Sequence, residues 1–135
     1  MIEWVCRSLV DSPYCIGLCL SEDKFQKELK RLKVSRETWP KWISDGAGAT
    51  VHFFDKSNDN HCCAIICLDG KEKKTSNETV GLLIHEAVHV WQAVCDNIGE
   101  EKPSKEFEAY SIQYISQRLI TAYSDIKAKE KRKKG

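Results

Sequence analysis

The chain has 135 residues, of which 41% are hydrophobic and 30% charged, and its formal net charge is +1. This length and composition are typical of one soluble globular domain, and the near-zero charge excludes a general attraction to nucleic acid or to an anionic membrane. No apolar run reaches the roughly 18 residues of a membrane span. Charged residues also interrupt the N-terminal segment, so we expect no signal peptide and a cytoplasmic protein.

The first half of the chain predicts alternating helices and strands, from runs of β-branched and apolar residues and from charge placement at helix ends. The expected elements, in chain order, are a short helix at 2–10, a buried strand at 14–21, a helix beginning at Ser21, a loop or short helical turn at 35–49, and a β-hairpin with strands at 50–56 and 61–69.

The seven cysteines are expected to be reduced, buried thiols, because most of them lie inside apolar runs and their number is odd. A weaker alternative is a structural metal site, formed by Cys15, Cys19, His61 and Cys62. Their spacings match no standard zinc pattern, and neighbouring strand residues such as Cys62 and Cys63 should face opposite ways.

A long helix is predicted at 76–97. Thr75 and Glu78 fit a capping box at its start, and Gly99 ends it. The segment is apolar on nearly every face, which predicts a helix in the middle of the domain. A last helix follows from Pro103. We therefore predict an α+β domain over 1–126, in which a short antiparallel or mixed sheet packs on the buried helix.

The segment 127–135 is strongly basic, with six Lys or Arg and one Glu. We expect it to be a frayed, solvated helix end. Nucleic-acid binding through it is the weaker interpretation, because no aromatic residues are interleaved with the basic ones.

The predicted buried helix carries His85, Glu86 and His89. Residues four apart lie on one face of a helix, so the two imidazoles can point at one ion. Glu86 is rotated by about 100° from His85. Its carboxylate can therefore flank the metal without binding it, and take a proton from a water that the metal activates. Unpartnered histidines on a buried helix would also be costly, which favours a zinc ion as their partner.

Zinc needs a third protein ligand if its fourth position is to stay open for water. Glu106 is the best candidate, because it begins the last helix, which can return across the first after a short connection. Other candidates are His52, His61, Asp96 and the acids after Gly99.

The motif His-Glu-Ala-Val-His, followed one short loop later by Glu-Phe-Glu-Ala-Tyr, resembles the gluzincin clan of zinc peptidases. The resemblance covers residues 75–115 and implies a minimal zincin-like fold with one zinc ion per chain. It implies that His85, His89 and Glu106 are zinc ligands and that Glu86 is the general base. The same segment is also similar to small zincin-like proteins of tailed bacteriophages and prophages, which would place the protein in a host cytoplasm.

Tyr110 departs from the clan's pattern, since that position usually holds a short acidic or amide residue that steadies a ligand histidine. Glu108, two residues after Glu106, is therefore the alternative third ligand. Gln92 is expected to orient His89 by a hydrogen bond. The residue that would stabilise the oxyanion stays open among Tyr14, Tyr110, Tyr114 and His52.

The predicted function is a zinc metallopeptidase acting on a peptide or protein substrate. The alternative is a non-catalytic binding or assembly module whose zinc is purely structural. A fourth protein ligand would be the sign of that module. Neither the substrate nor the oligomeric state follows from the sequence.

Overall fold

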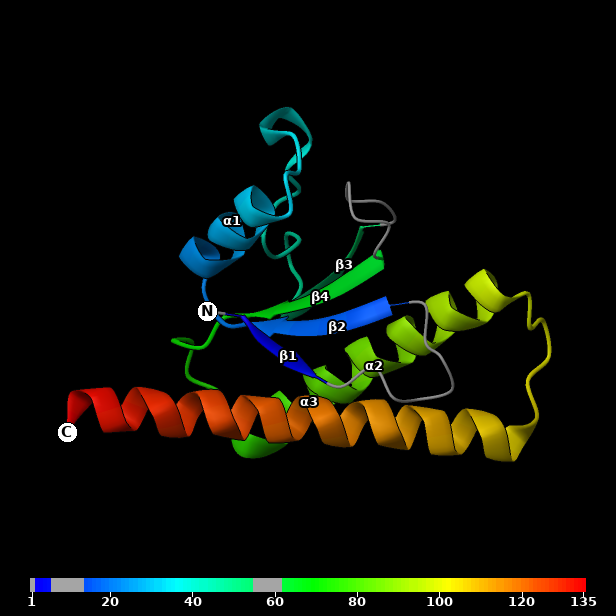
Figure 1. Ribbon diagram of the computed structural model, residues 1–135. Helices are drawn as coiled ribbons and strands as arrows, with labels where there is room; N and C mark the ends of the chain where they lie inside the picture. The colour runs from blue at the N-terminus through cyan, green and yellow to red at the C-terminus, as the bar shows by residue number, and fades with distance from the viewer. Residues whose placement is uncertain (1, 6–13, 55–61) are drawn as a thin grey trace.

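A computed structural model describes residues 2–5, 14–54 and 62–135 (Figure 1). These residues form an α+β fold with a mixed four-stranded sheet and three α-helices, which confirms the predicted class. The elements are β1 (Glu3–Val5), β2 (Tyr14–Cys19), α1 (Glu22–Arg31), a 3₁₀ turn (Arg36–Thr38), β3 (Ala49–Phe54), β4 (Cys62–Leu68), α2 (Ser76–Ile98) and α3 (Lys105–Lys134).

The strand order is β1-β2-β4-β3, so β1 and β3 are the edges of the sheet. β2 pairs with β4 in parallel, and the two edge strands pair antiparallel to their neighbours. α1 covers one face of the sheet, and α2 and α3 cover the other (Figure 1). Side chains that alternate along the strands fill both cores, with Leu18 facing α2 and Cys19 facing α1.

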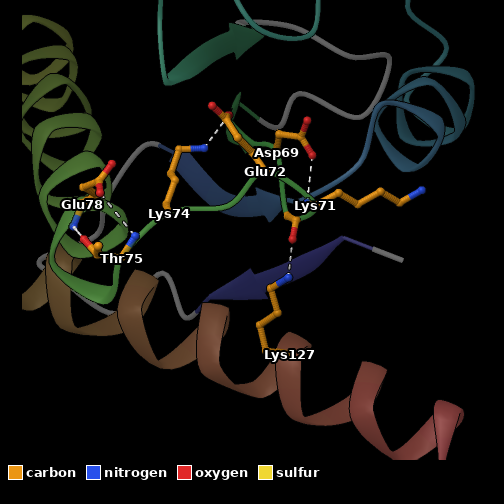
Figure 2. Close-up of polar contacts among 8 residues, drawn as sticks. Asp69, Lys71, Glu72, Lys74, Thr75, Glu78 and Lys127 are labelled. Carbon is orange, nitrogen blue, oxygen red and sulfur yellow. Dashed lines mark hydrogen bonds and ion pairs between the residues drawn. The ribbon is translucent and has the colours of Figure 1, made fainter.

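The start of α2 follows the predicted capping box. The Thr75 hydroxyl accepts the Glu78 backbone N–H at 3.1 Å, and the Glu78 carboxylate accepts the Thr75 N–H at 3.4 Å (Figure 2). Gly99 ends the helix with a left-handed φ of 74°, which a glycine adopts without steric cost. These two signals fix where the histidine motif stands on the helix.

The expectation of a helix at 2–10 is wrong over residues 3–5, which form β1. β1 pairs with β2, and Trp4 lies over Gly17, where an added Cβ would come within 2.9 Å of both Trp4 and Ile2. The missing side chain at Gly17 thus makes room for the edge strand, a tertiary contact that local patterning does not contain. Residues 6–10 lie outside the described residues.

The segment 127–135, expected to be a frayed, solvated helix end, continues α3 as far as Lys134. The Lys127 ammonium donates to the Gly70 carbonyl (Figure 2), and Lys129 pairs with Glu3 at 3.2 Å. These contacts tie the start of the basic segment to the body of the domain, and cations in the last turn suit the helix dipole. No helix among the described residues is both long and apolar enough to cross a membrane.

The cysteine prediction is confirmed for Cys15, Cys19, Cys63, Cys67 and Cys95, which are free thiols. All five are buried or partly buried. Cys6 and His61 lie outside the described residues.

Candidate metal centre

α2 brings His85 and His89 together on one face, one turn apart. Their Nε2 atoms are 3.1 Å apart and their ring centroids 4.8 Å apart. Two nitrogens that each lie about 2.0–2.1 Å from a tetrahedral zinc are about 3.3 Å apart, so the pair is spaced as two ligands of one ion. The same spacing fits an N–H···N hydrogen bond between neutral imidazoles, so the pair is also satisfied without a metal.

Gln92 orients His89, as the sequence predicts. The His89 Nδ1 lies 3.1 Å from the Gln92 side-chain oxygen. With Nδ1–H as the donor, the neutral ring carries no proton on Nε2, and this nitrogen can accept a hydrogen bond or bind a metal. His85 would then donate its Nε2–H to His89, and a metal would replace that proton.

Glu86 lies beside the pair but points into the protein, with 4% of its surface exposed. The backbone N–H of Val51, on edge strand β3, donates to its carboxylate. Burial raises the pKa of the Glu86 carboxyl above its ordinary value, while the two histidines and the Val51 N–H oppose that rise. A buried carboxylate with raised basicity has the properties of a general base.

The expectation that α2 lies in the middle of the domain is wrong on the side of the two histidines, which are exposed. Leu83 and Val90 are fully buried, but Ile84, next to His85 in the chain, is 40% exposed. Exposed imidazoles pay no desolvation penalty, so the cost of burying them does not argue for a metal. What favours a metal is the spacing of the pair and the position of Glu86.

α3 packs against the side of α2 that faces away from the histidines. Trp91, about 200° around the helix from His89, contacts the ring of Phe107 at 5.0 Å. The Trp91 indole N–H also donates to Glu108 at 3.1 Å. The predicted alternative ligand Glu108 is therefore engaged on the opposite side of α2.

The structure does not bring Glu106 or Tyr110 to the histidine pair either. Glu106 is exposed on the first turn of α3, and Tyr110 is 65% exposed. Among the residues that the structure describes, no group of three or more His, Cys, Asp or Glu side chains is placed to hold a metal ion. Among the described residues, His85 and His89 are thus spaced to bind one zinc ion. Glu106 as the third ligand stays a prediction.

His52 faces the other side of the sheet from the histidine pair. Its Nε2–H donates to the Trp42 carbonyl at 2.8 Å, and its ring stacks on Phe25 of α1 at 5.0 Å. Alternation along β3 explains this placement, since the neighbouring Val51 faces α2. His52 is therefore a packing residue, and neither a ligand nor an oxyanion donor in this arrangement.

We expect His52 to make stability depend on pH. Burial lowers the pKa of His52, opposed by its bond to the Trp42 carbonyl. The unfolded chain, with an ordinary pKa of about 6.5, takes up a proton that the folded state resists, so stability falls as pH drops from 7.5 to 5.5. Urea unfolding midpoints should show this fall in the wild type. His52→Gln should reduce it, and an equal fall in both proteins would contradict the assignment.

A groove of about 790 Å³ runs along α2 from His89 to Asp96, and strands β2 and β3 line its other wall. Tyr14, an oxyanion candidate from the sequence, lies in this wall with Phe53 and Val51. Sequence reasoning missed the groove. One signal was available, because four polar residues follow each other at spacings of four, three and four on one face of α2: His85, His89, Gln92 and Asp96.

No family model, no curated protein and no solved structure matches this chain.

Proposed function

We propose that this chain is a zinc-dependent hydrolase that cleaves peptide bonds, built as a small zincin-like domain. One observation carries the proposal. His85 and His89 converge at 3.1 Å on the surface of α2, with the buried carboxylate of Glu86 directly beside them. Two imidazoles and a carboxylate in this order on one helix can supply two zinc ligands and the general base of a metallopeptidase.

Each of the three residues has a role in this proposal. His85 and His89 would hold the ion through Nε2, with Gln92 fixing the His89 ring. When bound, zinc supplies a Lewis acid that activates water and polarises the scissile carbonyl. Glu86 takes the proton of the attacking water and later gives it to the leaving amine. The Val51 N–H lies beside this carboxylate and favours its charged form.

The position of β3 at the edge of the sheet supports a peptide as the substrate class. β3 pairs only with β4, so no described strand covers its other side. The Val51 N–H points outward, to Glu86, and strand alternation turns the backbone groups of Ala49 and Phe53 to the same side. An extended peptide can add to such an edge through main-chain hydrogen bonds. That places its backbone next to Glu86.

Glu106 remains the proposed third ligand on the resemblance alone. Its carboxylate lies in the first turn of α3, just after the connection from α2. To reach the pair, it would have to leave its exposed position and cross to the histidine side of α2. A change in the N-terminal turns of α3 on zinc binding is part of this proposal.

The second candidate function is a zinc-containing binding or assembly module without catalysis. Its sign would be a fourth protein ligand that closes the site. A partner protein could complete such a site. The two candidates differ in whether Glu86 is needed for function.

Chelation tests the hydrolase directly. Purified protein is incubated with a library of short peptides, and cleavage is followed by mass spectrometry. We expect cleavage that 1,10-phenanthroline abolishes and that added zinc restores, because the ion supplies the Lewis acid. A cleavage that survives chelation, or a zinc-loaded protein that cleaves no peptide in the library, contradicts the proposal.

A further inference from the structure

We propose that the groove beside His89 is a specificity pocket for a lysine or arginine side chain of the peptide, and that Asp96 selects its positive charge. The inference rests on the proposed function in one respect, since it takes the peptide to lie across the histidine pair. Nothing in the resemblance to zinc peptidases assigns a role to this aspartate.

The groove joins the proposed reaction site to Asp96. Val51 lines the groove and also donates its N–H to Glu86, so the two sites share a residue. Asp96 follows His89 by seven residues, which is almost two full turns and about 10 Å along the helix. Both side chains therefore lie on the same face of α2, at the two ends of the groove.

The walls of the groove suit the stem of a long side chain. Tyr14 and Phe53 meet edge to face at 5.4 Å, and Ala93 lies opposite them on α2. Lysine and arginine place their methylene groups on such surfaces while the charged head stays in water, and a guanidinium also stacks on aromatic rings. Asp96 lies about 10 Å along α2 from His89. One residue of an extended peptide advances about 3.3 Å, so a long side chain on the residue next to the scissile bond can cover the rest of this distance.

Asp96 is available for a cation. Its side chain is exposed, and the described residues place no Lys, Arg or His within ion-pair distance of it. A glutamate side chain in the groove would meet the Asp96 charge and be repelled. An apolar side chain of equal length would fill the groove without pairing with the carboxylate. The groove should therefore bind basic side chains most tightly, apolar ones less tightly and acidic ones least.

Peptide binding tests the pocket without relying on catalysis. Fluorescently labelled hexapeptides, varied one position at a time among Arg, Lys, norleucine and Glu, are titrated by anisotropy against the full chain, with zinc and with chelator. At one position we expect Arg and Lys to bind about three- to tenfold more tightly than norleucine at low salt, and Glu more weakly still. This preference should shrink as salt screens the pair.

Variants of Asp96 identify the charge-selecting group. Asp96→Asn should erase the preference for Arg over norleucine, and Asp96→Lys should reverse it in favour of Glu. Asp125→Asn makes the same change on an exposed residue of α3 outside the groove, and it should keep the preference. A wild type without charge preference, or a preference that survives in Asp96→Asn, overturns the proposal.

The two proposals can fail separately. Charge-selective binding that depends on Asp96, without cleavage of any peptide, supports the pocket and contradicts the hydrolase. Zinc-dependent cleavage without charge preference at any position supports the hydrolase and contradicts the pocket.

Discussion

Glu86→Gln is expected to lower the kcat of peptide hydrolysis by about 10²–10⁴-fold while the zinc content stays unchanged. Glutamine has nearly the same shape and its oxygen can still accept the Val51 N–H, so the fold around β3 should persist. It cannot take a proton from water, because a neutral amide is not a base at neutral pH. Steady-state kinetics on one cleaved peptide give the kcat, and metal analysis of the same sample gives the zinc content.

A matched control for this change stands on the same helix. Glu78→Gln removes one carboxylate charge from the capping box at the start of α2, almost two full turns before His85 and on exposed surface. It should leave kcat within about twofold, since surface substitutions of this kind change stability by only a few tenths of a kcal/mol. Full activity in Glu86→Gln would instead favour the non-catalytic zinc module.

His85→Ala and His89→Ala are each expected to lose the zinc ion. Each variant removes one of the two proposed ligands, and a single imidazole with water does not hold zinc at the affinity of a protein site. Affinity should fall by at least about 100-fold, a larger loss than removal of a second-layer hydrogen bond such as that of Gln92 causes. Isothermal titration with zinc and metal analysis after dialysis measure the effect.

Three further variants sharpen this experiment. His52→Gln removes a histidine from the far face of the sheet and should keep the metal. Glu106→Gln should weaken zinc binding if this residue completes the site. Glu108→Gln should leave the metal in place, and its amide oxygen can still accept the Trp91 indole N–H. Zinc that stays bound after loss of either motif histidine would contradict the site.

Local signals in the sequence predicted much of the fold because they act over a few residues. The Thr75 capping box and Gly99 set the ends of α2, and β-branched and aromatic runs set β3 and β4. The predicted helix is wrong at 3–5 because the strand there depends on Trp4 packing over Gly17. Likewise, the contact of Lys127 with Gly70 joins residues 57 apart, and no local pattern contains it.

The candidate site, too, was predictable only where it depends on local spacing. The spacing of His85 and His89 fixes their approach, because four residues on a helix bring two side chains to one face whatever surrounds them. Which face of α2 meets the sheet, and which meets α3, depends on the packing of the whole domain. The exposure of the histidines and the separation of Glu106 from them follow from that packing. No local sequence pattern predicts it.

Zinc content of the wild-type protein tests the central claim most directly. The full chain is purified without chelator or added metal, and zinc is measured per mole of protein, with a zinc titration of any metal-free fraction. We predict about one zinc ion per chain, bound through His85 and His89. Protein that is isolated without zinc and binds none on titration would contradict the metal centre and the hydrolase built on it.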